Sequence, residues 1–185
     1  LRAVEHGIQS LRELNPDLPI TGRCTVTATN AHVLQDIARY ARSLGMRDLS
    51  FLAADHDSAH AFGRDGAVAI EVPEPEVLRT QLDALWTDPG PPFISNSEVS
   101  LQRILRKAEV DRGRGALHPP RCDAPWTSVV IDSNLAMRPC FFLEAQGDAR
   151  MGLVSGLAEG RTRRKSFRMT AETACARCVC WARLG

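Results

Sequence analysis

The feature that most constrains the fold of this chain is the distribution of its six cysteines over 185 residues. Cys24 stands alone, Cys122 and Cys140 flank one short segment, and Cys175-x2-Cys178 lies near the end of the sequence. A pair separated by two residues places both sulfur atoms on one turn of the chain, where they can share a metal ion. Since the sequence shows no secretory signal pattern, we expect metal or redox chemistry in a reducing compartment, the cytoplasm, in preference to a disulfide framework.

Composition excludes several classes of protein. A hydrophobic content of 44% and a charged content of 24% are typical of a folded globular chain and not of a disordered one. With 23 Lys and Arg against 22 Asp and Glu, the net charge of +1 argues against a dedicated nucleic-acid-binding protein. No apolar run approaches the roughly 18 residues of a membrane span, so we expect no membrane partner.

The first 62 residues predict helix, strand, helix and strand in that order. Residues 23–29 and 49–54 are rich in β-branched or apolar side chains and predict two strands. The helix between them is expected to be capped by Asn30 and to end at Gly45. This βαβ unit predicts two parallel strands with a right-handed crossover. The apolar positions expected on the first helix are Leu1, Val4, Ile8, Leu11 and Leu14, and those on the second are Val33, Ile37, Tyr40, Ala41 and Leu44.

The middle of the chain is less regular. Residues 67–72 predict a further strand, and Val77, Leu78, Leu82 and Leu85 have helical spacing after it. Ser95–Glu98 has the spacing of a capping box and opens another helix. A linker at 112–115 then predicts two domains, 1–115 and 116–185. Because one βαβ unit cannot bury both faces of its sheet, and Leu1 already lies inside a helical pattern, we expect residues 1–115 to be the second half of a larger α/β domain.

The last third of the chain predicts a small cysteine-bearing module. Residues 128–132 and 135–140 form the strands of a predicted β-hairpin, with Ser133-Asn134 as its turn. Cys122 precedes this hairpin and Cys140 closes it, and residues 166–169 predict a short helix. Four thiolates in two pairs suit a tetrahedral zinc ion or an iron–sulfur cluster, and the spacing alone leaves both open, together with a zinc-stapled hairpin that performs no chemistry.

Four segments of this module resemble one family closely. They are Cys122-Asp-Ala-Pro-Trp126, Ser128-Val-Val-Ile-Asp132, Met137-Arg-Pro-Cys-Phe-Phe142 and Cys175-Ala-Arg-Cys-Val-Cys180. The pattern is similar to the SPASM or twitch auxiliary-cluster module at the C-terminal end of radical S-adenosylmethionine enzymes. In that family one cysteine precedes a hairpin, a second follows a "G-x4-C" turn, and a C-x2-C completes the ligands of a 4Fe-4S cluster. The upstream βαβ unit, with 25–30 and 44–51, is similar to the second half of the family's partial (β/α)6 barrel.

The resemblance implies a fold, a cofactor and ligands. It implies the C-terminal part of a partial TIM-like barrel followed by a hairpin and helix module that binds one 4Fe-4S cluster. The implied ligands are Cys122, Cys140, Cys175 and Cys178. Five cysteines lie in the block, fewer than two clusters require, and Cys180 matches a further family cysteine of less defined role. Leu135 occupies the family's glycine position, so we expect Asn134 to take the left-handed conformation and the turn to shift.

The implied activity is radical modification of a peptide or a small biosynthetic intermediate, with the auxiliary cluster positioning substrate or transferring electrons, and with an electron-donor protein as a further partner. The C-x3-C-x2-C motif that such chemistry requires is absent from the 185 residues, so this chain alone is not expected to cleave S-adenosylmethionine, which would be a cofactor of the full-length enzyme. The alternative is a non-catalytic module, stabilised by zinc or a cluster, that binds a peptide.

A few other residues have both a chemical and a structural interpretation. Cys24 is expected to be a buried thiol, and Thr25 and Thr27 to share one strand face that borders the S-adenosylmethionine site in the family. Asp55-His56-Asp57 and His60 follow a strand, where barrel active sites lie, but we expect them to form a solvated polar loop in preference to a substrate or metal site. The basic run 161–165 is expected to be a solvated helix face or a contact for an acidic partner. Trp126 is expected to shield the cluster from solvent.

Overall fold

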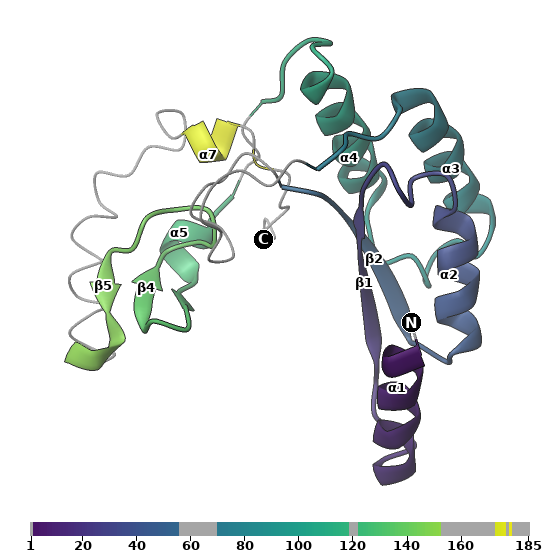
Figure 1. Cartoon of the computed structure of the whole chain (residues 1–185), viewed down its shortest axis with the longest axis horizontal. Helices are drawn as coiled ribbons and strands as arrows, with labels where there is room; N and C mark the ends of the chain where they lie inside the picture. The colour runs from purple at the N-terminus through teal and green to yellow at the C-terminus, as the bar shows by residue number, and fades with distance from the viewer. Residues whose placement is uncertain (1, 56–69, 119–121, 153–172, 177, 179–185) are drawn as a thin grey trace. The chain divides into compact units, whose positions relative to one another are not determined.

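The computed structural model describes residues 2–55, 70–118, 122–152, 173–176 and 178. The chain divides into two compact units. The first comprises residues 1–54 and 70–115, and the second comprises residues 55–69 and 116–185. Figure 1 labels the helices and strands of both units.

The first unit is built on a parallel pair of strands. β1 (Thr21–Val26) lies beside β2 (Asp48–Ala53), with Thr21 opposite Asp48 and Val26 opposite Ala53. The connection between them is α2 (Leu34–Ser43). The predicted βαβ unit is therefore confirmed, with each strand boundary shifted by one to three residues.

A third parallel segment extends this sheet at the other edge of β2. The Leu49 N–H donates to the Phe93 carbonyl and the Ser95 N–H donates to the Leu49 carbonyl, both at 2.9 Å, in a parallel bridge between Leu49 and Ile94. The strand predicted at 67–72 is wrong for residues 70–72, which are irregular, and residues 67–69 lie outside the described part of the chain. Pro73 follows directly and has no N–H to donate to a strand ladder.

Two further helices cover the same face of the sheet as α2 (Figure 1). They are α3 (Pro75–Thr87) and α4 (Glu98–Asp111). Both were predicted from their apolar periodicity, but the capping residue of α4 is Ser97, whose hydroxyl oxygen accepts the Ser100 N–H at 3.2 Å. Ser95 instead donates its hydroxyl to the Leu49 carbonyl. The core packs Val26, Leu34, Ala38, Phe51, Leu78, Leu82, Leu85, Leu101, Ile104 and Leu105.

The start of α2 differs from the prediction. Asn30 does not cap it: its amide donates to the Thr25 carbonyl and accepts the Thr27 N–H, both at 2.9 Å, which closes the turn after β1. The helix begins after Val33, and its buried residues are Leu34, Ala38 and Ala41. The buried face of α2 is therefore shifted by about one residue from the predicted face, because the turn after β1 delays the start of the helix. Gly45 adopts φ +72° as predicted.

The first helix, α1 (Arg2–Leu14), has the predicted position but not the predicted burial. Ile8 is its buried residue, whereas Val4, Leu11 and Leu14 are 54%, 45% and 84% exposed. Polar contacts attach the helix to the rest of the unit, since Arg12 donates to the Gly45 carbonyl and Tyr40 donates to Glu5.

The second unit contains the predicted hairpin and a strand that the sequence did not reveal. β3 (Val130–Ile131) and β4 (Ala136–Arg138) pair antiparallel, and β5 (Gly147–Asp148) adds to the other edge of β4. The strands are two or three residues long, and β4 ends at Arg138 because the next residue, Pro139, has no N–H to donate. A short helix, α5 (Ala124–Thr127), precedes the hairpin, η2 (Ala149–Met151) follows β5, and α7 (Thr173–Ala176) lies further along the chain. The helix predicted at 166–169 lies outside the described residues.

The observed class is mixed α/β, as predicted, and the strands within the described ranges close no barrel. None of the helices in these ranges has the length and apolarity that crossing a bilayer requires.

Candidate functional site

The hairpin turn before Cys140 is held by one carboxylate. Asp132 accepts the N–H groups of Asn134 at 2.9 Å and Ala136 at 3.1 Å, and its carbonyl accepts the Leu135 N–H. Leu135, not Asn134, adopts the left-handed conformation, with φ +63°. The expected shift of the turn is therefore wrong. Two amides directed at Asp132 hold the turn with positive φ at position 135.

Arg138 connects this turn to the segment that carries Cys140. Its guanidinium donates to the Asp132 carboxylate at 3.2 Å and to the Leu143 carbonyl at 3.0 Å. The Leu143 N–H in turn donates to the Cys140 carbonyl at 3.2 Å. Burial acts to raise the pKa of Asp132, but the amides of Asn134 and Ala136 and the Arg138 charge together outweigh it, so the pKa is lowered.

The segment that follows Cys122 is also tied to the neighbourhood of Cys140. Ser128, at the end of α5, donates its hydroxyl to the Ala124 carbonyl at 2.8 Å and to the Pro139 carbonyl at 3.1 Å. Pro125 in α5 and Pro139 are both buried. The chain stretches that carry the first two cysteines are therefore joined by a hydrogen bond one residue from Cys140.

The second cysteine pair lies on a single turn, as the spacing predicts. Cys175 belongs to α7, and the Cys178 N–H donates to the Cys175 carbonyl at 3.3 Å. All four predicted ligands are half-buried thiols. Within the described residues, which include all four, no three or more Cys, His, Asp or Glu side chains are grouped closely enough to hold a metal ion. Convergence of the two pairs thus stays a prediction.

The chemistry of these four cysteines nevertheless fits the expected cofactor. Four thiols that are neither fully exposed nor joined in disulfides are suitable ligands for iron–sulfur or zinc. Trp126, in α5, is 48% exposed, so its shielding role also stays a prediction. Cys180 and the basic run 161–165 lie outside the described residues.

Cys24 has the structural role expected of an isolated thiol. It is half-buried in β1, where its sulfur lies 3.8 Å from the Asn30 amide nitrogen. Burial raises the pKa of the Cys24 thiol, which keeps it protonated and a poor nucleophile at neutral pH.

The sheet of the first unit has one polar face. Thr21, Arg23 and Thr25 on β1 are exposed and lie in register with Asp48, Ser50 and Leu52 on β2. Thr27 does not share this face as predicted, because β1 ends at Val26 and Thr27 belongs to the following turn. Parallel sheets are usually covered on both faces. The helices α2, α3 and α4 cover the opposite face.

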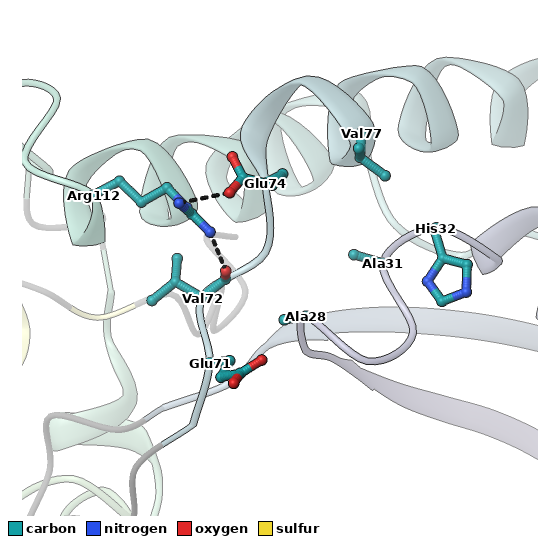
Figure 2. A pocket seen from close by; sticks show the side chains of 8 residues that line it. All are labelled: Ala28, Ala31, His32, Glu71, Val72, Glu74, Val77 and Arg112. Atoms are coloured by element: carbon teal, nitrogen blue, oxygen red, sulfur yellow. Dashed lines mark hydrogen bonds and ion pairs between the residues drawn. The ribbon is translucent and has the colours of Figure 1, made fainter.

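A pocket of about 480 Å³, which the sequence did not reveal, lies after the carboxyl end of β1 (Figure 2). Its lining residues come from the turn after β1, the segment before α3, α3 itself and the end of α4: Ala28, Ala31, His32, Glu71, Val72, Glu74, Val77 and Arg112. These segments are far apart in sequence, so no local pattern identifies the pocket. The sequence-based candidate site at a strand end was placed after β2, at Asp55 and the residues that follow it. Of these, His56, Asp57 and His60 lie outside the described residues.

The comparisons with known proteins identified no relative of this chain. A scan against family models, a search of curated proteins and a search of solved structures each found no match to this chain.

Proposed function

We propose that this chain is the C-terminal portion of a radical S-adenosylmethionine enzyme and that residues 116–185 bind one auxiliary 4Fe-4S cluster. The observation that carries the proposal is the left-handed backbone of Leu135, five residues before Cys140. The family places glycine at this position, and glycine adopts such a conformation without a steric penalty. A left-handed residue at this position supports the resemblance although the glycine itself is replaced.

The first unit supports the barrel part of the proposal. β1, β2 and the segment around Ile94 are parallel and lie side by side in chain order, with helices on one face. Consecutive neighbours of this kind are typical of (β/α) barrels. The polar face formed by Arg23, Thr25 and Ser50 is then the face that would line the barrel interior.

The residues of the module have definable roles in this proposal. Cys122, Cys140, Cys175 and Cys178 would ligate the cluster, which when bound supplies electron transfer or a binding position for substrate. Asp132 and Arg138 hold the turn that positions Cys140. Substrate would be a peptide or a small biosynthetic intermediate, electrons would come from a donor protein, and S-adenosylmethionine would bind to the part of the enzyme that carries C-x3-C-x2-C. The expected compartment is the cytoplasm, where thiols remain reduced.

Anaerobic reconstitution of the full 185-residue chain with iron and sulfide tests the proposal. We expect about four irons per chain, as one 4Fe-4S cluster requires. Each of the variants Cys122→Ala, Cys140→Ala, Cys175→Ala and Cys178→Ala should lose most of this iron. Cys24→Ala is the matched control, because Cys24 lies in the first unit, and it should retain the wild-type iron content. Cys180→Ala measures whether that cysteine takes part.

Two results would overturn the proposal. Stable binding of zinc without iron uptake would favour the alternative, a zinc-stabilised peptide-binding module. An equal loss of iron in Cys24→Ala and in Cys178→Ala would show that the iron is bound without a defined site. Independently, the proposal requires an in-frame C-x3-C-x2-C in the coding sequence upstream of Leu1.

A further inference from the structure

The pocket after β1 has the properties of a small-ligand site separate from the cysteine module. Its volume of about 480 Å³ lies within the range of roughly 300–1,000 Å³ that small-molecule sites occupy. It opens at the carboxyl end of a parallel strand, where α/β sheets bind ligands. Its walls include the apolar side chains of Ala28, Ala31, Val72 and Val77.

The charges around the pocket do not cancel. The guanidinium of Arg112 pairs with Glu74 at 2.7 Å and donates to the carbonyls of Val72 at 2.8 Å and Pro73 at 3.0 Å. Figure 2 shows this pair at one edge of the pocket and His32 at another. Glu71 also lines the pocket, and among the described residues none gives its carboxylate a hydrogen bond or an ion pair. Glu71 is exposed, so its carboxylate is a solvated negative charge at the edge of the apolar walls.

The backbone holds Glu71 in this place. The Ala28 N–H donates to the Glu71 carbonyl at 3.2 Å, which joins the turn after β1 to the segment before α3. Arg112 fixes the next residue, Val72, through its carbonyl. The carboxylate is thus attached to a stretch of chain that is anchored from both the turn after β1 and the end of α4.

We propose that this pocket binds an organic cation, a primary ammonium or guanidinium group on a short aliphatic chain. The Glu71 carboxylate would face the cation, and the four apolar side chains would contact the aliphatic part. A lysine or arginine side chain of a peptide and a free small amine share this chemistry. A partly exposed ion pair contributes at most about fivefold to affinity.

Titration of the full 185-residue chain, followed by NMR chemical shifts, tests this inference without any need for iron. The probe is Nα-acetyl-lysine amide, and Nα-acetyl-norleucine amide is its uncharged counterpart, which should bind about fivefold more weakly. Glu71→Gln should weaken binding of the lysine probe by about the same factor. Glu76→Gln is the matched control, since Glu76 is an exposed residue of α3 that does not line the pocket.

A second pair of variants tests the cavity itself. Val77→Trp should fill the pocket and abolish binding, whereas Val99→Trp, at an exposed position of α4 outside the pocket, should bind as the wild type does. Tighter binding of Ala-Lys-Ala than of butylamine would assign the cation to a peptide, and equal binding would assign it to a free amine. Equal affinity of the two amide probes, or unchanged binding by Glu71→Gln, would overturn the inference and leave the cluster proposal untouched.

Discussion

Leu135 shows how a turn can impose an unfavourable conformation on a single residue. An L-residue with a Cβ in the left-handed region is destabilised by about 1–2 kcal/mol. Two backbone amides directed at Asp132 fix the turn, and Leu135, 44% exposed, has little packing that would favour leucine over glycine. The sequence predicted positive φ at Asn134, because asparagine tolerates this conformation. In the structure the hydrogen-bond pattern of the whole turn gives positive φ to Leu135 instead.

Replacing Leu135 with glycine is expected to stabilise the second unit by about 0.5–1 kcal/mol, because the relief of strain exceeds the entropy that glycine adds to the unfolded chain. Urea unfolding, followed through NMR signals of the hairpin, measures this difference. Leu135→Ala is the control: it keeps the Cβ and therefore the strain, so it should be no more stable than the wild type. A glycine variant less stable than the wild type would contradict the expectation.

Lys107 is the buried charge of the first unit. Its ammonium contacts both carboxylate oxygens of Asp111, at 2.6 and 2.5 Å, and the two side chains are 2% and 3% exposed. We expect Lys107→Ala to lower the free energy of unfolding by about 3 kcal/mol or more, since it removes the ammonium that faces the buried Asp111 carboxylate. Arg106→Ala, which removes an exposed side chain paired with Glu109, should change it by less than about 1 kcal/mol, since Glu109 also pairs with Arg79.

Denaturant unfolding of both variants gives the comparison. The double variant Lys107→Leu/Asp111→Leu should recover most of the loss, because it removes both charges together. If the single and double variants were equally unstable, packing and not charge would account for the effect.

At the scale of elements, the hairpin depends on the ionised form of Asp132. Its pKa is lowered in the folded protein, so the stabilisation is fully present above the ordinary aspartate value of about 3.9 and is lost as the pH falls through the lowered value. Stability of the hairpin should therefore decline below about pH 4. Asp132→Asn should be less stable at neutral pH and should show a flatter decline.

The measurement is urea unfolding of the hairpin amides by NMR between neutral pH and about pH 2 to 3, below the ordinary aspartate value. Asp83→Asn, at an exposed position of α3 in the other unit, is the control and should follow the wild-type curve. Parallel curves for the wild type and Asp132→Asn would show that this carboxylate does not link the hairpin to pH.

At the scale of the whole molecule, the two units should respond differently to metal. No three potential ligands are grouped among the described residues, so binding by four thiolates has to draw Cys122 and Cys140 closer to Cys175 and Cys178. Metal binding of this kind is coupled to folding. Reconstitution with iron and sulfide should therefore increase hydrogen-exchange protection at least about tenfold in 122–152 and leave α3 and α4 unchanged, which mass spectrometry can measure. Equal protection before and after loading would contradict this expectation.

The sequence by itself determined those features that depend on near neighbours in the chain. Helical spacing located α3 and α4, and the C-x2-C pair lies on one turn, because each follows from contacts within a few residues. The βαβ order made β1 and β2 parallel, because a crossover helix between neighbouring strands of one sheet joins them in parallel. Contacts between distant segments were decided only by the tertiary structure. Ile94 pairs with Leu49 of β2, and Glu71 meets the turn after β1 at a pocket, because backbone groups about 40 or more residues apart satisfy one another there.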